Sequence, residues 1–495
     1  MTDRPVLVLG ASGYVGARLV PKLIEQGYTV RAGGRSVSRL GKRPWAKHPQ
    51  VSLCEVDVFD EASLQRAAKG CGAVFYLVHS MSPSTASFET ADRNAANNMV
   101  KAAESGGVDR IIYLGGLGQD EPGLSKHLQS RFEVGEILRS GSVPVTILRA
   151  AMIIGSGSAS FEILRYLVER LPVMITPKWV RTEAQPIAIG DVLAYLLGCL
   201  EHPETKGRTF DIGGPGIVNY RDLMRIYSEE AHLTKRLVVP VPVLTPRLSS
   251  YWIHLVTPVP ASLARPLAEG LSNRVVCHDT SILDIVDHTP TPYRLAFRKS
   301  LDEVERKVAG IDPLPDASVP AEWTMEGDPH WSGGSIYVDN RRIVLKASPE
   351  DIWEPLCRIG GKNGWYYANW LWWLRGILDR LVGGVGLRKG RTHSDDIEKG
   401  DIVDFWRVSD VKVNERLRLV AEMRVPGYAV LEFDLRELGD GRTELSQIAR
   451  FATRGLLGVL YWYAVSPLHN LVFNGMLKGI ARKSKKPVLT GPERI

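Results

Sequence analysis

The chain has 495 residues, of which 44% are hydrophobic and 24% are charged, and its formal net charge is +7. This length is too great for one ordinary hydrophobic core, so we expect two or three globular domains. The charge is small for the length, and no basic stripe, zinc-ligand pattern or RNA-binding aromatic motif accompanies it, which argues against a nucleic-acid partner.

The first residues, MTDRPVLVLGASG, enter a predicted strand at once and leave no room for a signal peptide, so we expect a cytoplasmic protein. The cysteines are scattered, odd in number and never spaced as Cys-x-x-Cys. They are Cys54, Cys71, Cys199, Cys277 and Cys357. This pattern predicts free thiols in a reducing compartment, without disulfides and without a metal site.

Short apolar runs alternate with helical patterns over about the first 230 residues. The runs that we expect to form strands are 6–10, 29–34, 51–57, 73–78, 110–116 and 145–150. The segments between them have helical spacing, and most end in glycine. Such alternation predicts an α/β domain of the Rossmann type, with helices on a doubly wound parallel sheet.

The most specific motif is VLVLGASGYVGARLV, which follows the first predicted strand and opens a helix near Tyr14. Gly10 allows a tight turn, Gly13 lets the backbone approach a pyrophosphate, and Gly16 lets the helix pack close to the strand. The N-terminus of the helix also favours an anion. At the first strand–helix turn of an alternating chain the motif predicts a dinucleotide site, and the alternative is a plain tight turn.

The end of the second predicted strand decides which dinucleotide binds. An acidic residue there would accept a ribose hydroxyl of NAD, but the sequence is AGGRSVSRL, with Arg35, Ser36 and Arg39. A guanidinium favours a 2′-phosphate, so we expect NADP(H) to be preferred over NAD(H). The alternative is that these arginines are only solvated. Asp57 ends the third strand and either meets the adenine or, like Asp60, caps a helix.

The residues that we expect to bind the cofactor lie at the ends of the first four strands. They are Gly10, Ser12, Gly13, Tyr14, Val15, Gly16, Arg35, Ser36, Arg39, Asp57, Val58, Val78 and His79. His79 and Ser80 end the fourth strand, where a nicotinamide would lie in such a fold. The polar residues His393, Asp395 and Asp396 form no recognisable ligand spacing with a second cluster, so we expect a polar loop and no metal.

The chain is less regular after residue 150. Segments 186–202 and 219–232 have helical spacing, and we expect about 236–310 to form a helical extension of a first domain that spans 1–310. Segment 311–334 is dense in Pro, Gly and Asp, which predicts a linker.

The remaining residues, 335–495, differ in composition from the first part of the chain, and nine of the twelve tryptophans lie from Trp323 onward. Segment 335–347 alternates as a strand, and 348–360 begins as a helix with a Ser cap and Pro at its first position. Period-two strands follow between 401 and 453, before a long helical pattern that runs to about residue 483. This order predicts an α+β domain in which a curved sheet grips a helix around a cavity.

Motifs in both parts resemble known families. In the order GASGYVG, GGR, VDVFD, YLGGLG, ILRAAMIIG, PIAIGDVLAYLL and FDIGGP, residues 4–235 resemble the atypical short-chain dehydrogenase/reductases of the NmrA-like kind. The motifs GGVGLRKGR, GDIVDFWRV, EMRVPGYAVLEFDL and LYWYAVSPLHNLVFNGM resemble the DUF2867 family, a relative of the START/SRPBCC folds that bind hydrophobic ligands. The combination resembles the YbjT-like two-domain oxidoreductases. The resemblance implies NAD(P) binding and a redox function, without a particular substrate.

The resemblance also implies an active site from which the usual residues are missing. A typical relative uses Tyr as acid/base, Lys four residues later to lower its pKa and hold the ribose, and Ser after the fifth strand to polarise a carbonyl. Here Gly115 or Gly116 stands at the Ser position, and His127 and Arg131 stand at the Tyr and Lys positions. Tyr113 is a substitute acid on a strand, where we expect it to be core.

Three interpretations of His127 and Arg131 remain open. In the first interpretation, His127 donates a proton, since its ordinary pKa of about 6.5 suits neutral pH, and Arg131 holds the ribose. Alternatively, hydride transfer to a quinone or another activated acceptor needs no strong acid. In the third interpretation the site only binds NADP(H) and reports its redox state. The alternative is that His127 has no function and is a surface or capping histidine at the start of a helix.

The densest aromatic stretch is GWYYANWLWWLRGILDRLVGG. It places Trp370, Trp373, Ile377 and Leu381 on one helical face, which is typical of core packing. The alternatives are a hydrophobic ligand cavity and an interfacial helix whose tryptophans lie at the level of lipid headgroups.

The run 455–473 is the nearest to a membrane span, but Pro467, His469 and Asn470 interrupt it, so we expect an amphipathic or buried helix. The tail KGIARKSKKP adds positive charge beside this helix. Such charge favours peripheral contact with an anionic membrane at the inner face, and a solvated basic end is the alternative.

Together these patterns predict a cytoplasmic oxidoreductase that uses NADPH to reduce a hydrophobic, quinone-like or lipid-derived substrate presented by the second domain. The alternatives are a non-catalytic NADP(H)-binding redox sensor and a membrane-associated lipid-binding accessory protein. The retained glycine motif favours the enzyme, and the lost Tyr and Ser favour the sensor.

Overall fold

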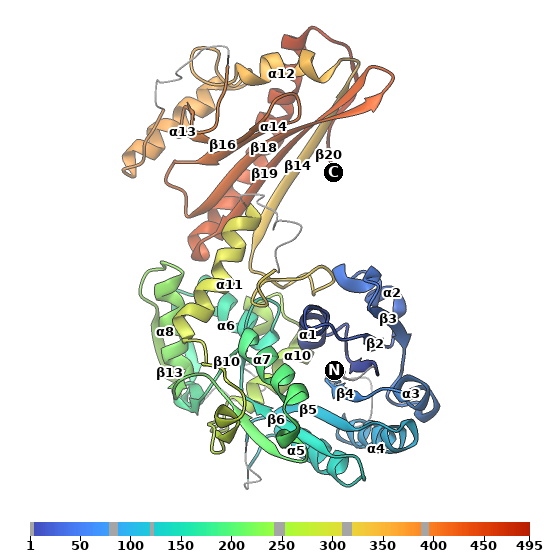
Figure 1. The fold of residues 1–495 in the computed structure, drawn as a ribbon. Helices are drawn as coiled ribbons and strands as arrows, with labels where there is room; N and C mark the ends of the chain where they lie inside the picture. Colours follow the sequence, from blue (N-terminus) through green and yellow to red (C-terminus); the bar gives the residue numbers. More distant parts are fainter. Residues whose placement is uncertain (1–3, 79–87, 119–122, 242–252, 309–318, 388–395) are drawn as a thin grey trace. The chain divides into compact units, whose positions relative to one another are not determined.

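The computed structural model describes residues 4–78, 88–118, 123–241, 253–308, 319–387 and 396–495. These residues divide into two compact units (Figure 1). The first unit is Met1–Glu303 with Pro315–Gly334, and the second is Val304–Leu314 with Ser335–Ile495.

The first unit is built on a seven-stranded sheet in the order β11-β6-β5-β4-β1-β2-β3, and every neighbouring pair in it is parallel. Its strands are β1 Val6–Leu9, β2 Val30–Gly34, β3 Val51–Glu55, β4 Ala73–Tyr76, β5 Arg110–Gly116, β6 Val145–Ala150 and β11 Thr209–Ile212. The six strands predicted from apolar runs all form, and the prediction of a Rossmann-type parallel sheet is confirmed.

Helices cover both faces of this sheet because alternate residues of each strand point to opposite sides. Val6 and Val8 of β1 belong to the core under α1 and α7, whereas Leu7 and Leu9 belong to the core under α3, α4 and α5. The bounds are α1 Tyr14–Glu25, α7 Ile189–Glu201, α3 Glu61–Ala68, α4 Phe88–Gly106 and α5 Lys126–Arg139.

The other described elements of the first unit include three two-stranded sheets, β7 with β10, β8 with β13 and β9 with β12. The strands are β7 Ile153–Ile154, β8 Val173–Pro177, β9 Glu183–Ala184, β10 Ile187–Ala188, β12 Val218–Asn219 and β13 Leu237–Val241. The helices are α2 Val37–Leu40, α6 Ala159–Arg170, α8 Tyr220–Glu230, α10 Ala261–Gly270 and α11 Tyr293–Val308, of which the residues from Val304 onward belong to the second unit. Short 3-10 turns lie at Pro44–Lys47, Lys178–Arg181, Pro203–Thr205 and Ser281–Asp284.

Two expectations about the region between the domains need correction. The segment 236–310 contains α10 and α11, but it opens with strand β13 because that segment pairs with β8. The first unit also ends before residue 304, since Val308 at the end of α11 is buried with Val430 and Ala452 of the second unit.

The linker expected over 311–334 is wrong for its described part, 319–334, which packs into the first unit. Trp331 lies in a buried cluster with Ile163 of α6, and its carbonyl accepts a hydrogen bond from the Tyr166 hydroxyl. Composition alone reads this Pro- and Gly-rich segment as a linker because its anchoring contacts are made by residues far away in the sequence. Trp323 and Trp331 therefore mark the first unit, not the second.

The second unit is an antiparallel seven-stranded sheet in the order β15-β16-β17-β18-β19-β14-β20. Its elements are β14 Ile336–Leu345, α12 Pro349–Cys357, α13 Asn369–Leu381, β15 Ile402–Val403, β16 Trp406–Lys412, β17 Arg416–Ala421, β18 Gly427–Gly439, β19 Arg442–Thr453, α14 Gly455–Ser484 and β20 Val488–Arg494. The predicted start of α12 is confirmed, since Ser348 caps it in a capping box and Pro349 occupies the first turn. Strand β20 was not predicted, because its side chains are mostly exposed and give no alternating pattern.

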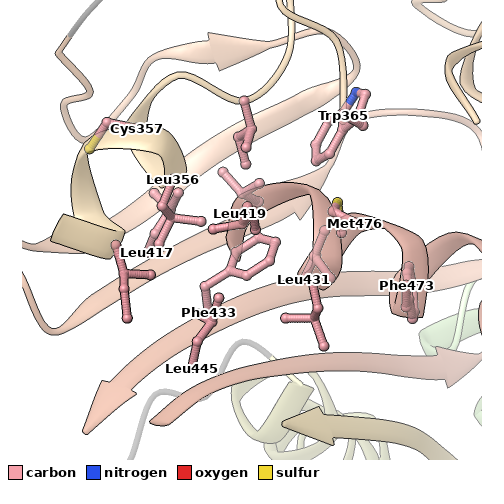
Figure 2. Packing of buried hydrophobic residues seen from close by; sticks show 14 of the residues in the cluster. Leu356, Cys357, Trp365, Leu417, Leu419, Leu431, Phe433, Leu445, Phe473 and Met476 are labelled. Atoms are coloured by element: carbon pink, nitrogen blue, oxygen red, sulfur yellow. The ribbon is translucent and has the colours of Figure 1, made fainter. Parts of the chain in front are cut away.

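The core of the second unit lies between this sheet, α12 and α14 (Figure 2). Leu431 and Phe433 of β18 and Leu445 of β19 pack there with Phe473 and Met476 of α14. The interior is closed further by stacked indoles, with the ring centres of Trp365 and Trp372 4.5 Å apart. The antiparallel sheet with a long helix on one face agrees with the predicted α+β class.

The preferred interpretation of the aromatic stripe on α13 is wrong. Trp370 and Trp373 are 65% and 60% exposed, and Leu381 is 76% exposed. The side of α13 that packs inward carries Trp372, partly buried against the core, and the buried residues Gly376 and Asp379. The 3.6-residue period located an apolar face correctly but could not say that the protein leaves that face uncovered.

Helix α14 is a single helix of 30 residues and is long and apolar enough to cross a membrane by length and composition, with a mean hydropathy of 1.3 over its most apolar window. Only 22% of that window is buried. The sequence predicts an amphipathic or buried helix here, and α14 is buried on one side only, which agrees with the amphipathic alternative.

Candidate functional site

The glycine motif forms the turn between β1 and α1. Gly10 has φ of 84°, a left-handed conformation, and a Cβ there would lie 2.9 Å from the carbonyl oxygen of Leu77 on the neighbouring segment. A Cβ at Gly16 would collide with the carbonyl oxygen of Gly10. Both positions therefore require glycine for the reasons that the motif predicts.

The N-terminus of α1 is suited to an anion. Gly13 is its N-cap and contributes no capping side chain, and the first turn contains no acidic residue. The N–H groups of a first helical turn lack partners within the helix, so they can donate to a phosphate, and a glycine N-cap lets the phosphate approach closely. The residues present thus fit the pyrophosphate of a dinucleotide.

A cavity of about 820 Å³ extends from this turn across the ends of the strands. Eleven predicted residues line it. They are Gly10, Ser12, Gly13, Tyr14, Val15, Gly16, Arg35, Val58, Val78, His127 and Arg131. Ser36, Arg39 and Asp57 do not line it, and His79 lies outside the described residues.

One end of the cavity carries an uncompensated positive charge. Arg35 is exposed where β2 ends, and among the described contacts no carboxylate lies within ion-pair distance of it. Ser36 instead caps α2 by accepting a hydrogen bond from the Arg39 backbone N–H at 3.3 Å. Arg35 is therefore the arginine of this segment that is placed to meet a ligand.

Asp57, which was considered for the adenine, and Asp60, which was considered as a helix cap, both accept hydrogen bonds from nearby backbone N–H groups. Asp57 Oδ1 accepts from the backbone N–H of Phe59 at 3.1 Å, which closes the turn after β3. Asp60 is the N-cap of α3 and accepts from the backbone N–H of Ala62 at 3.0 Å. Val58 and Phe59 between them present apolar side chains to the cavity.

His127 and Arg131 come to the cavity from the first turns of α5, which Ser125 caps. They face the end of β5, where a Cβ at Gly116 would lie 2.8 Å from Cδ2 of Leu128. A small side chain at 116 would therefore require the Leu128 side chain to move. Tyr113 is core as expected, buried on β5 with its hydroxyl donating to the carbonyl oxygen of Arg131 at 3.0 Å.

The environment of His127 disfavours its protonated form. Burial and the nearby positive charge of Arg131 lower the pKa of His127 to about 4. The imidazole is then neutral at physiological pH, so it is a poor proton donor for carbonyl reduction. The interpretation that relied on an ordinary histidine pKa loses its basis, because sequence spacing does not reveal burial.

The opposite end of the cavity is largely apolar but includes Ser158, Ser160 and Ser262, and the sequence did not predict its residues. Met152 follows β6, Tyr220 begins α8, and Leu267 belongs to α10. Leu271 and Val275, just beyond α10, complete this end. Met152 lies in the motif ILRAAMIIG, just after a predicted strand whose carboxyl end could have indicated it. Tyr220, Leu267, Leu271 and Val275 come from segments that only the tertiary fold brings there.

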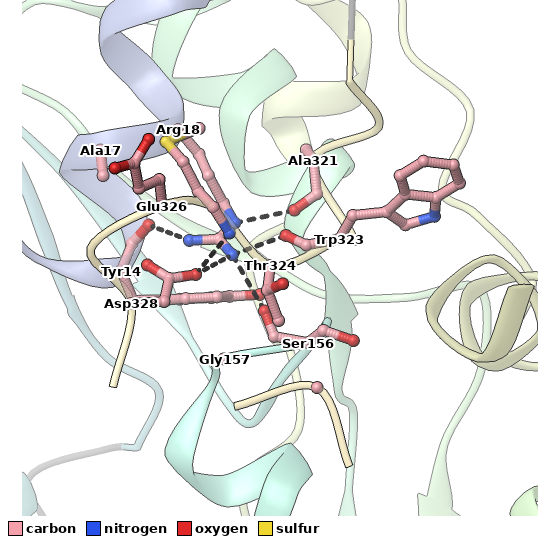
Figure 3. Close-up of polar contacts among 12 residues, drawn as sticks. Tyr14, Ala17, Arg18, Ser156, Gly157, Ala321, Trp323, Thr324, Glu326 and Asp328 are labelled. Carbon is pink, nitrogen blue, oxygen red and sulfur yellow. Dashed lines mark hydrogen bonds and ion pairs between the residues drawn. The ribbon is translucent and has the colours of Figure 1, made fainter. Parts of the chain in front are cut away.

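A buried ion-pair cluster lies beside the glycine turn, and Figure 3 shows its pair of Arg18 and Asp328. Asp328 pairs with Arg18 at 2.7 Å and with Arg43 at 2.9 Å, and all three side chains are almost fully buried. Arg43 also donates to the carbonyl oxygen of Ser12 in the turn at 2.6 Å. Burial alone would raise the pKa of Asp328, but the charge of Arg18 and the hydrogen bonds hold it below its ordinary value.

Arg18 of α1 also binds the backbone of segment 319–334. Arg18 donates to the carbonyl oxygens of Ala321 at 2.8 Å and Trp323 at 2.7 Å (Figure 3). Its guanidinium lies 4.1 Å from the ring centre of Tyr14, which borders the cavity. Segment 319–334 is thereby part of the structure that holds the dinucleotide turn.

Comparison with known proteins identifies both parts of the chain. Residues 10–165 match the NAD(P)H-binding family, and residues 331–476 match the family described as protein of unknown function DUF2867. The mitochondrial NADH dehydrogenase [ubiquinone] 1 alpha subcomplex subunit 9 of Arabidopsis thaliana is 24% identical over 317 residues, which are 59% of this chain and 77% of that protein.

Other relatives are reductases. The dihydroflavonol 4-reductase of Zea mays is 34% identical over 123 residues, which are 23% of this chain and 34% of the maize enzyme. The structure of triphenylmethane reductase from Citrobacter sp. has a TM-score of 0.50 and 18% identity, and the match covers 60% of this chain and 99% of that one. The last likeness shows a shared fold. Residues 10–165 thus match an NAD(P)H-binding domain, which has a Rossmann-type fold here, and residues 331–476 match a DUF2867 domain.

Proposed function

We propose that the protein is an NADPH-dependent oxidoreductase that reduces a hydrophobic, quinone-like or lipid-derived acceptor. One observation carries this proposal: a single cavity joins the glycine turn and Arg35 to an apolar end formed by Met152, Tyr220 and Leu267. Its volume of about 820 Å³ lies within the usual range for cofactor and ligand sites. A nicotinamide between the two ends would face an apolar acceptor.

The acceptor in this proposal is one that accepts a hydride without help from a strong acid, because the described residues around the cavity include no strong acid at the usual position. The neutral His127 and the glycines at 115 and 116 leave a ketone oxygen without the usual donors. A quinone needs none, since the hydride from NADPH gives a stabilised hydroquinone anion that then takes a proton from solvent. The products are NADP⁺ and the hydroquinone.

The cofactor is NADP(H) in preference to NAD(H). Arg35 follows β2 with no carboxylate partner among the described residues, and a guanidinium can bind a 2′-phosphate through charge-assisted hydrogen bonds. Arg131, which borders the cavity from α5, is the residue for the nicotinamide ribose. When bound, the cofactor supplies the hydride, and the residues of this chain bind and orient it.

The second unit handles hydrophobic ligands in the manner of START/SRPBCC folds and brings the substrate to the first unit. The antiparallel sheet that packs around α14 supports this part of the proposal. We place the protein in the cytoplasm, with peripheral contact at the inner face of a membrane.

A non-catalytic NADP(H) sensor is the second candidate function. The observation that favours it is the lowered pKa of His127, together with glycine at both positions available for the usual serine. Such a protein would keep the dinucleotide turn and bind NADPH without turnover.

The experiment that separates these functions measures NADPH oxidation by the purified chain with quinones, enals and ketones, while bound NADPH is quantified in parallel. Turnover with quinones or enals but not with simple ketones supports the proposed function. Tight NADPH binding with no turnover on any acceptor supports the sensor. Turnover with simple ketones would contradict the argument from His127.

A further inference from the structure

The exposed surface of the second unit contains an apolar face on α13. Trp370, Trp373, Leu374, Leu378 and Leu381 are all at least 40% exposed on this one helix of 13 residues. Isolated exposed apolar side chains are common, but two neighbouring tryptophans among exposed leucines are unusual for a monomer surface.

The first half of α14 presents a second row of exposed apolar side chains. Leu457, Leu460, Leu468 and Leu471 recur at helical spacing on the side opposite the core, and Tyr463 lies beside them. After residue 474 this outer side changes character and carries Lys478 and Arg482. An apolar stretch that ends in basic residues is typical of a helix in a membrane interface.

The two rows belong to neighbouring helices. The Arg375 guanidinium of α13 lies 5.9 Å from the ring centre of Tyr461 on α14, and a Cβ at Gly475 would collide with the ring of Tyr367 just before α13. We call the exposed apolar side chains of both helices the α13–α14 face. It comprises Trp370, Trp373, Leu374, Leu378, Leu381, Leu457, Leu460, Tyr463, Leu468 and Leu471.

The two segments that carry this face are rich in basic residues, of which Arg358, Arg454 and Lys486 pair with Glu354, Glu305 and Asp351 outside the segments. Segments 358–387 and 454–486 contain ten Lys and Arg residues and one acidic residue, a net charge of +9 against +7 for the whole chain, so the remainder is net negative. The one acidic residue, Asp379, is buried and accepts hydrogen bonds from the backbone N–H groups of Gly386 at 2.8 Å and Arg424 at 2.7 Å. Its charge is therefore directed into the protein.

We propose that the α13–α14 face docks on an anionic phospholipid bilayer. Exposed Trp and Leu side chains enter the boundary between headgroups and acyl chains, and the surrounding Lys and Arg side chains meet the lipid phosphates. The charge complementarity selects a membrane over a second copy of this chain, because a second copy would bring the same net positive charge to the interface.

Helix α14 lies in the interface and does not cross it. Gly458 and Trp462 near its start, and Phe473, Met476 and Ile480 in its second half, are buried on its inner side. A spanning helix would have to expose this side to lipid and open the core of the second unit.

The test is co-sedimentation of the full-length protein with phosphatidylcholine vesicles that contain or lack phosphatidylglycerol. We expect binding to the anionic vesicles, weaker binding at high salt, and a blue shift of tryptophan fluorescence. The double variant Trp373→Glu/Leu457→Glu should bind about tenfold more weakly or worse, since each substitution places a charge at the apolar boundary. Its far-UV circular dichroism should be unchanged, because both side chains are exposed.

Val413→Glu is the matched control, since Val413 is 68% exposed in the same unit but lies in the turn between β16 and β17. It should bind vesicles as the unchanged protein does. The proposal is overturned if the protein binds neither kind of vesicle, or if its binding does not depend on phosphatidylglycerol. It is also overturned if Val413→Glu loses as much binding as the double variant. A dimer in solution that the double variant dissociates, without vesicle binding, would assign the face to a second copy and also overturn it.

Discussion

At the scale of single residues, the proposed preference for NADP(H) depends on the positive charge that follows β2. Arg35→Ala should weaken NADPH binding about tenfold or more, because a hydrogen bond to a charged group contributes about 1.5–3 kcal/mol. NADH, which lacks the 2′-phosphate, should lose much less. Dissociation constants from fluorescence titration with both nucleotides measure the difference.

Arg39→Ala is the control for this variant, because Arg39 is also exposed after β2 but does not line the cavity. Its binding of NADPH should stay close to that of the unchanged protein. Equal weakening of NADPH and NADH by Arg35→Ala would contradict the assignment to the 2′-phosphate.

The ionisation of His127 gives a second prediction at this scale. A pKa of about 4 means that the folded protein keeps His127 neutral while an unfolded chain protonates it below about pH 6.5. The contribution of His127 to the free energy of unfolding therefore has its full value above about pH 6.5 and decreases as the pH falls towards 4. His127→Gln should therefore lose less stability than the unchanged protein between pH 6.5 and 4, as measured by thermal unfolding.

The same pKa predicts the pH dependence of turnover. Since His127 does not change its charge between about pH 5 and 8, the kcat/KM profile with a quinone should have the same shape in the unchanged protein and in His127→Gln. An acidic or basic limb near pH 6.5 that disappears in the variant would restore His127 as the proton donor.

At the scale of elements, segment 319–334 acts on the dinucleotide turn through one carboxylate. Asp328→Asn leaves Arg18 and Arg43 buried with no anionic partner in the cluster, and breaking a buried ion pair costs about 3–5 kcal/mol. We expect a lower melting temperature of the first unit and weaker NADPH binding, because Arg43 holds the carbonyl oxygen of Ser12.

Asp109→Asn is the comparison for this prediction, since Asp109 pairs with Arg4 at 3.0 Å on the surface. Exposed pairs of this kind contribute about 0–1 kcal/mol, so the change should be small in both measurements. If the two variants behave alike, segment 319–334 does not support the turn.

Helix α13 shows how far an element can be predicted. Its period gave the helix and the apolar stripe of Trp370 and Trp373, and the indole of Trp372 lies on the side that faces the core. Both sides of this helix are rich in apolar residues, so the pattern could not decide which side the sheet covers. Which side packs inward depends on two residues of the helix. Gly376 lets Leu387 pack closely against it, and the buried Asp379 carboxylate accepts a hydrogen bond from the backbone N–H of Gly386 in the turn after the helix.

At the scale of the whole molecule, the two compact units predict two unfolding transitions. NADPH at about 100 times its dissociation constant should add about 2.7 kcal/mol to the first unit and raise its melting temperature by about 4 °C. Seven of the twelve tryptophans lie in the second unit, so the fluorescence transition should follow that unit and move little. A single transition that NADPH shifts as a whole in calorimetry would show that the units unfold together.

The sequence by itself determined the parallel α/β sheet, the dinucleotide turn and the antiparallel second domain. These features follow from local patterns: glycines with required backbone geometry at Gly10 and Gly16, and strand and helix periods along the chain. Arg35 could be placed at the cavity because the carboxyl end of a β-strand in such a sheet has a known location.

Only the tertiary structure decided the neutral state of His127, the apolar end of the cavity, the return of 319–334 to the first unit and the exposure of Trp370 and Trp373. Each of these depends on burial by residues distant in sequence. Desolvation, ion pairing and the covering of an apolar face are set by which elements pack together, and a local pattern carries no information about that choice.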